Sequence, residues 1–120
     1  MDLVDEQLKN SRTIAVVGLS GDPERTSYRV TQYMQQQGYR IIPVNPMVQE
    51  VLGEKSYPDL KSVPEPIDMV NVFRRSELVP PVIEEAIEVG VKYIWMQDGV
   101  INAEWAAKAE AAGIPVIQDD

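Results

Sequence analysis

Residue types that bind anions stand at two points of the chain, each directly after an apolar run. The turn Gly18-x-Ser20-x-x-Pro23 follows the run 14–17, and Arg74-Arg75 follows the run 68–73. A helix that starts after a glycine-containing turn offers unpaired N–H groups and a partial positive charge, and arginine offers a planar fork of donors. Both patterns indicate binding of a phosphate group.

The turn departs from the full dinucleotide-binding fingerprint, because Ser20 and Pro23 replace its second and third glycines. It favours some nucleotide over NAD, and an ordinary strand-to-helix turn is the alternative. NAD-binding domains also place an acid about 20 residues after the glycine turn, to hold the ribose diol. Here Asn45 stands in that region. An amide there suits a ribose that carries a phosphate, although Asn45 before Pro46 is also a common start of a turn.

The two arginines and the segment 97–99 can also be explained by purely structural roles. Arg74 and Arg75 can form surface ion pairs with acidic neighbours such as Glu77. Because both arginines follow a strand at the expected functional edge, we favour ligand contact for at least one of them. The segment Gln97-Asp98-Gly99 can line the same crevice or form a plain turn.

Composition narrows the chemistry further. The chain has 120 residues, a net charge of −8, and neither cysteine nor histidine. Thiol nucleophiles, cysteine zinc sites and histidine bases are therefore excluded, which favours a binding module over an enzyme and predicts no metal site. The negative charge disfavours nucleic acid and anionic membranes as partners. We expect one domain over residues 1–120, no membrane span and a cytoplasmic location.

Apolar runs alternate with helical patterns, which predicts an α/β fold with a mainly parallel sheet. Strands are expected over 13–18, 40–45, 68–73, 92–96 and 114–117, with Pro43 marking a strand near an edge. Helices are expected over 2–12, from Pro23 to Gly38, over 79–90 and over 102–112. In the second of these helices, Val30, Tyr33 and Met34 are expected to face the core. Asp22 is the expected N-cap of the second helix, and the alternative is a later start capped by Thr26 or Ser27. Residues 46–66 form a long connection with a short helix and a turn at 53–55.

In such a sheet, ligands bind outside the carboxyl ends of the strands. Five segments near those ends and along the connections carry a resemblance to a known family: Ile14-Ala15-Val16-Val17-Gly18-Leu19-Ser20, Gly38-Tyr39-Arg40-Ile41-Ile42-Pro43-Val44-Asn45-Pro46, Leu52-Gly53-Glu54-Lys55-x-Tyr57-Pro58, Val72-Phe73-Arg74-Arg75-Ser76 and Trp95-Met96-Gln97-x-Gly99-Val100. Together they closely resemble the small bacterial and archaeal CoA-binding proteins, which are similar to the N-terminal domain of the succinyl-CoA synthetase α subunit.

The resemblance implies a Rossmann-like three-layer αβα fold that binds coenzyme A. It implies that Gly18, Leu19 and Ser20 hold the pyrophosphate and that Pro43, Asn45 and Pro46 border the adenosine. It further implies that Phe73, Arg74 and Arg75 close over the nucleotide and its ribose phosphate, and that Gln97 and Gly99 lie toward the pantetheine. The phosphohistidine of the synthetase reaction has no counterpart here, so the resemblance implies ligand binding without ligase activity.

Three hypotheses follow. The first is a non-catalytic module that binds coenzyme A or an acyl-CoA. The second is an enzyme, either an NAD(P)-linked oxidoreductase or an acyl-CoA ligase subunit that needs a partner. The third is a regulatory protein that docks on a partner protein and responds to CoA.

Overall fold

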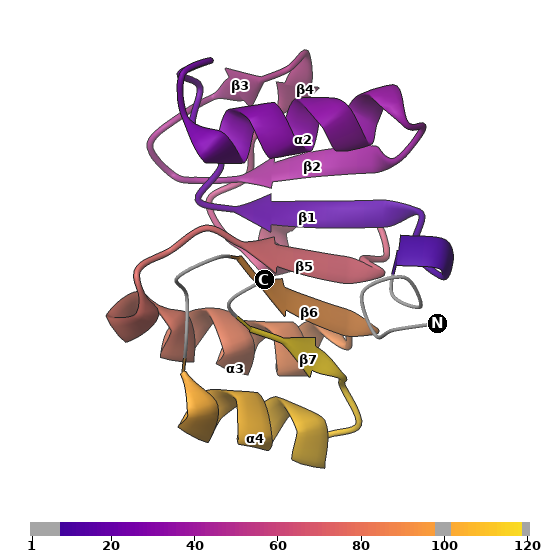
Figure 1. The fold of residues 1–120 in the computed structure, drawn as a ribbon, viewed down its shortest axis with the longest axis vertical. Coiled ribbons are helices and arrows are strands. Elements are labelled where there is room, and N and C mark those ends of the chain that lie inside the picture. Colours follow the sequence, from indigo (N-terminus) through magenta and orange to yellow (C-terminus); the bar gives the residue numbers. More distant parts are fainter. Residues whose placement is uncertain (1–7, 98–101, 119–120) are drawn as a thin grey trace.

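The computed structural model describes residues 8–97 and 102–118. Its main sheet contains β1 (Thr13–Val17), β2 (Arg40–Val44), β5 (Met69–Val72), β6 (Tyr93–Met96) and β7 (Val116–Ile117). The strand order is β2-β1-β5-β6-β7, and every neighbouring pair is parallel. The predicted five-stranded Rossmann-like α/β fold is confirmed (Figure 1).

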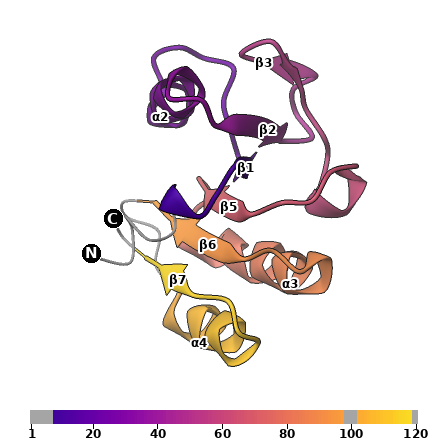
Figure 2. The same ribbon diagram turned by 90° about the vertical axis from the view of Figure 1, so that its right-hand side faces the viewer.

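Helices cover both faces of the sheet. Helix α2 (Thr26–Gln36) lies on one face, and α3 (Val79–Val89) and α4 (Ala103–Ala111) lie on the other (Figure 2). Successive residues of β1 alternate between the two faces: Ile14 packs in the cluster that holds Met34 of α2, whereas Ala15 packs with α3 and α4. A strand buried on both faces needs a continuous apolar run, which is why this pattern was readable in the sequence.

Helix α2 differs from its prediction at its start. It begins at Thr26 with Arg25 as N-cap residue, so the helix does start later than Pro23, but neither Asp22 nor Thr26 or Ser27 is its cap. Asp22 instead forms a separate turn before the helix, because its side chain accepts from the N–H of Glu24 and its carbonyl from the N–H of Arg25.

The buried face of α2 also differs from its prediction. Tyr33 was expected to face the core but is 62% exposed. The buried stripe is Ser27, Thr31 and Met34, whose spacing follows one side of a helix. Met34 is therefore buried as expected and Val30 is partly buried, whereas Tyr33 lies outside the buried stripe, in which two of the three side chains are small and polar.

The connection after β2 contains a hairpin that was not foreseen. Strands β3 (Glu50–Val51) and β4 (Glu54–Lys55) pair antiparallel, and the 3₁₀ helix η1 (Leu60–Ser62) is the expected short helix. The hairpin turn lies at Leu52 and Gly53, which both have positive φ, as two-residue hairpin turns require. Leucine rarely adopts this conformation, so the sequence lacked the usual signal.

The prediction for Pro43 is confirmed, since β2 is an edge strand. The carbonyl of Val44 accepts a hydrogen bond from the N–H of Gly18, which follows β1, so the backbone of Val44 points toward β1. Because backbone groups alternate in direction along a strand, the nitrogen and carbonyl of Pro43 point away from β1. Its carbonyl accepts from the Tyr57 N–H at 3.0 Å. The proline nitrogen, which has no hydrogen to donate, thus lies away from β1.

The remaining helix predictions hold within the described residues. Gly90 ends α3 with φ +83°, and the Asn102 side chain caps α4 by accepting from the Trp105 N–H at 3.1 Å. Of the helix predicted over 2–12, Leu8 and Lys9 are helical and residues 2–7 lie outside the described part. No helix in the described ranges is long and apolar enough to cross a membrane.

Asp68 ties three strands together at the amino edge of the sheet. Its carboxylate accepts from the N–H groups of Arg12 and Thr13 at 2.8 and 3.0 Å, and Lys92 Nζ lies 3.4 Å away. Burial raises the pKa of this carboxyl, but the two N–H donors and Lys92 outweigh it, so the pKa lies below its usual value. Stability from Asp68 is therefore complete above the unfolded-state pKa of about 3.9 and is lost as pH falls through the lower folded-state value.

Asp68→Asn is expected to lower the free energy of unfolding by about 1–2 kcal/mol at pH 7, because it removes a charged acceptor of two bonds. The difference from wild type should shrink as pH falls below the unfolded-state pKa of about 3.9 and through the lower folded-state pKa of Asp68. Urea unfolding at pH 7 and pH 3 measures this, with exposed Glu110→Gln as control. An equal loss at both pH values would contradict the charged role.

Candidate functional site

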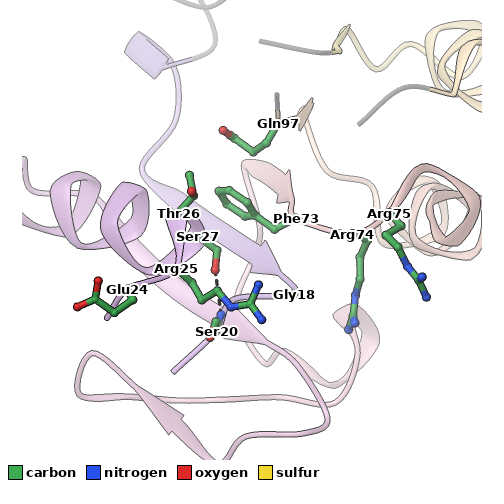
Figure 3. Close-up of a pocket in the computed structure, with 10 residues that line it drawn as sticks. All are labelled: Gly18, Ser20, Glu24, Arg25, Thr26, Ser27, Phe73, Arg74, Arg75 and Gln97. Atoms are coloured by element: carbon green, nitrogen blue, oxygen red, sulfur yellow. Dashed lines mark hydrogen bonds between the residues drawn. The ribbon is translucent and has the colours of Figure 1, made fainter. Parts of the chain in front are cut away.

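A cleft opens at the carboxyl edge of the sheet, where the strand order changes direction. The chain passes from β1 to β2 on one side, whereas β5, β6 and β7 follow on the other, so the change falls between β1 and β5. This switch point is the usual ligand crevice of open parallel sheets. The cleft has a volume of about 740 Å³ and is lined by Gly18, Ser20, Glu24, Arg25, Thr26, Ser27, Phe73, Arg74, Arg75 and Gln97 (Figure 3).

Gly18 allows the loops after β1 and β5 to meet at the base of the cleft. Its φ is +83°, and an added Cβ would lie 2.4 Å from the carbonyl oxygen of Phe73. A glycine at such a turn can let a ligand approach the backbone closely. The structure shows that it first allows one loop to approach the other, which places Phe73 and Arg74 beside the start of α2.

The loop between β1 and α2 satisfies part of its own backbone. The Ser20 N–H donates to Ser27 Oγ at 3.1 Å, and the Asp22 N–H donates to Ser20 Oγ at 3.0 Å. The N–H of Ser20 is therefore already used within the protein. The N-terminus of α2 has no side-chain cap, so its first turn directs N–H groups and a partial positive charge toward the cleft.

Three arginines give the cleft a positive charge in an acidic protein. Arg25 and Arg74 form no ion pair with any described residue, whereas Arg75 lies 3.5 Å from Glu77. The acidic lining residue, Glu24, pairs with Arg29 at 3.3 Å and points away from Arg74 in Figure 3. The site therefore combines two uncompensated guanidinium groups with a helix N-terminus, which is an arrangement suited to phosphate.

The opposite wall of the cleft is neutral. Gln97 follows β6 and is 9% exposed, and its amide nitrogen donates to Asn71 Oδ1 within β5. Phe73 is partly buried and lies between Gln97 and the arginines in the view of Figure 3. Within the described ranges, no group of three or more carboxylate, histidine or cysteine side chains is placed to hold a metal ion.

Not every predicted residue lines the cleft. Leu19 is fully buried in the core, and Pro43 and Pro46 lie in and after β2, beside the cleft. Asn45 acts within the protein: its Nδ2 donates to the Leu19 carbonyl at 3.0 Å and its Oδ1 accepts from the Met47 N–H at 2.9 Å. The second bond confirms a turn at Asn45. Gly99 lies outside the described residues.

Sequence reasoning missed Glu24, Arg25, Thr26 and Ser27, which all line the cleft. The miss follows from placing the helix start at Pro23, which put these residues within the helix. A start at Thr26 would have placed an arginine at the N-cap and two hydroxyl side chains in the first turn.

A family model described as CoA binding domain matches residues 12–120. This chain belongs to the CoA-binding domain family. The match spans β1 through β7 and includes every residue that lines the cleft. The predicted resemblance is thus confirmed at the level of the family.

Known proteins of two sizes are similar to the chain. The uncharacterized protein YneT of Bacillus subtilis is 48% identical over 116 residues, which cover 97% of this chain and 86% of YneT. The acetate–CoA ligase (ADP-forming) II subunit alpha of Pyrococcus furiosus is 36% identical over 84 residues. That alignment covers 69% of this chain but 18% of the ligase subunit, so the chain spans about a fifth of that relative.

Solved structures of the family share the whole fold. A hypothetical protein from Pyrococcus horikoshii OT3 superposes with a TM-score of 0.93 and 37% sequence identity, and the match covers 97% of this chain and 82% of that one. Agreement over nearly the entire length supports the order of the strands in the sheet.

Proposed function

We propose that this protein binds coenzyme A in the switch-point cleft as a nucleotide-binding module without catalysis of its own. One observation carries the proposal: Arg25 and Arg74, which form no ion pair with a described residue, line the same cleft as the uncapped N-terminus of α2. In a chain with a net charge of −8, this is a local site for a polyanion. Membership of the CoA-binding family supports coenzyme A as that polyanion.

The parts of the ligand are assigned by charge. The first turn of α2 and Arg25 hold the pyrophosphate, because N–H groups and a guanidinium converge there. Arg74, assisted by Arg75, holds the ribose phosphate, and Phe73 closes over the nucleotide. Gln97 lies toward the uncharged pantetheine arm.

Further proposed contacts extend along the edge of the sheet. Pro43, Asn45 and Pro46, at the end of β2, border the adenosine. Gly18, Leu19 and Ser20 shape the phosphate end, and Gly99 belongs to the pantetheine side. The bonds of Asn45 to Leu19 and Met47 support a role in holding this border rigid.

A second candidate is a subunit of an acyl-CoA ligase that needs a partner protein. The similarity to the Pyrococcus furiosus ligase subunit favours it. In that case the cleft still binds CoA, and the ligase chemistry resides in parts of the enzyme outside the region that matches this chain. A role as an NAD(P)-linked oxidoreductase is less well supported, because Asn45 stands where a ribose-binding acid is usual.

Thermal unfolding with a panel of ligands tests the proposal. At 100 times its dissociation constant, a ligand should add about 2.7 kcal/mol to the free energy of unfolding, which raises Tm by roughly 10 °C for a chain of this size. We expect the largest shift with CoA, a smaller one with dephospho-CoA, and little with NAD at equal concentration. NADP separates a general preference for a ribose phosphate from recognition of CoA.

A shift with NAD and none with CoA would overturn the proposal. The ligase-subunit candidate is tested separately, by incubating the CoA-loaded protein with acetate and ATP and assaying for acetyl-CoA, ADP and phosphate. Turnover would favour the ligase candidate, whereas CoA binding without turnover is expected both of the binding module and of a ligase subunit without its partner.

A further inference from the structure

The neutral wall of the cleft contains a buried pair of amides. Asn71, within β5, is fully buried, and Gln97 is 9% exposed at the end of β6. Strands β5 and β6 pair with Asn71 opposite Trp95, so Gln97, two residues further, lies on the same face of the sheet. Gln97 Nε2 donates to Asn71 Oδ1. Two polar side chains in an apolar sheet cost stability unless each is hydrogen-bonded, which calls for a specific reason for their presence.

The neighbours of Asn71 determine which way both amides point. Asn71 Nδ2 lies 3.9 Å from Met34 Sδ, across the sheet face in α2. A thioether sulfur accepts hydrogen bonds and has no hydrogen to donate. Asn71 therefore directs its NH₂ group to Met34 and its oxygen to Gln97. Gln97 in turn must present its NH₂ group to Asn71.

This arrangement leaves the amide oxygen of Gln97 for a ligand. No described residue donates a hydrogen bond to Gln97 Oε1, and Gln97 lines the cleft. The arginines offer only donors, so the two sides of the cleft are chemically opposite. The positive side suits phosphate, and the Gln97 side suits a group that carries an N–H or O–H.

We propose that Met34 and Asn71 position Gln97 so that its amide oxygen accepts a hydrogen bond from a neutral N–H group of the ligand's uncharged arm. The inference rests on the proposed function, since the amides of pantetheine supply such N–H groups at the end of CoA away from the nucleotide. Gln97 is the contact residue, and Asn71 is a positioning residue that acts through it. The cleft thereby selects a phosphate-containing ligand with a hydrogen-bond-donating arm.

The experiment compares CoA with adenosine 3′,5′-bisphosphate, which lacks the pantetheine arm, by isothermal titration calorimetry. Gln97→Met removes the acceptor at similar volume, and we expect a loss of CoA affinity of roughly 3- to 10-fold. Binding of the bisphosphate should stay within twofold of wild type. A merely structural role of Gln97 would weaken both ligands alike.

Two further variants test the positioning. Asn71→Leu should weaken CoA by no more than Gln97→Met does, and the double variant should be no weaker than Gln97→Met alone, because Asn71 acts through Gln97. Met34→Leu conserves volume and removes only the sulfur acceptor, so it keeps the test valid if Asn71→Leu does not fold. It should weaken CoA by about twofold without affecting the bisphosphate.

The outcomes separate this inference from the proposed function. If wild type binds neither CoA nor the bisphosphate, the proposed function fails. If wild type binds both and Gln97→Met leaves CoA unchanged, or weakens both ligands equally, the role of Gln97 is refuted. Additive losses in the double variant would refute the role of Asn71.

Discussion

Gly18→Ala is expected to lower the free energy of unfolding by about 3 kcal/mol or more. Two costs combine at this position. The backbone adopts φ +83°, which is unfavourable for alanine, and the new Cβ would lie 2.4 Å from the Phe73 carbonyl oxygen. Since the obstructing atom belongs to the backbone, the loops after β1 and β5 must separate. CoA binding should weaken as well, because Phe73 and Arg74 move away from α2.

Two other glycines separate these costs. Gly38 has φ +96° but open space around an added Cβ, so Gly38→Ala measures backbone strain alone, at about 1 kcal/mol. Gly21 has open space and no positive φ, so Gly21→Ala should change stability by less than about 0.5 kcal/mol. Chemical unfolding of the three variants gives the comparison. If Gly18→Ala and Gly38→Ala lose the same amount, the contact with Phe73 has no energetic importance.

Arg74→Ala is expected to weaken CoA binding by roughly 10- to 100-fold, which corresponds to the loss of a charge-assisted hydrogen bond of about 1.5–3 kcal/mol. The guanidinium is partly buried in the cleft and pairs with no described carboxylate, so its charge is available to a phosphate. Dephospho-CoA should lose less affinity than CoA, because Arg74 is assigned to the ribose phosphate. Reversal to glutamate should widen the difference between the two losses, because a carboxylate repels the ribose phosphate of CoA.

Matched arginines provide the controls. Arg29→Ala makes the same change in net charge on α2, but Arg29 is exposed, pairs with Glu24 and does not line the cleft, so binding should change less than twofold. Arg75→Ala should have an intermediate effect, since Arg75 lines the cleft but already pairs with Glu77. Calorimetric titration with both ligands measures these differences. Equal losses for CoA and dephospho-CoA in Arg74→Ala would refute its assignment to the ribose phosphate.

The fold was predictable where a segment shows a regular apolar pattern or a residue with a strong local conformational preference. The apolar runs of β1, β2, β5 and β6 require burial on both faces, and Gly90 and Asn102 have local conformational preferences that end one helix and begin another. The hairpin β3–β4 was not predictable in the same way, because its turn relies on Leu52 with positive φ, which surrounding contacts impose. Tyr33 was misplaced because two small polar residues, Ser27 and Thr31, share the buried face of α2 with Met34.

Some features of the candidate site were also predictable from the sequence, and others were not. By itself, the sequence determined which chemistry the protein lacks, and it placed Gly18, Arg74 and Gln97 after strands whose carboxyl ends share one edge of a sheet. It also carried the motifs of the family. Those properties depend on composition and on local periodicity, which a single chain displays directly.

Tertiary structure alone decided how these residues are used. It showed that Gly18 accommodates the Phe73 carbonyl, that Arg25 joins the cleft because α2 begins three residues later than expected, and that Asn71 and Met34 orient Gln97. Each relation joins residues from different elements, up to 63 positions apart between Met34 and Gln97. Their distances and directions depend on strand pairing and helix packing, which no local sequence pattern records.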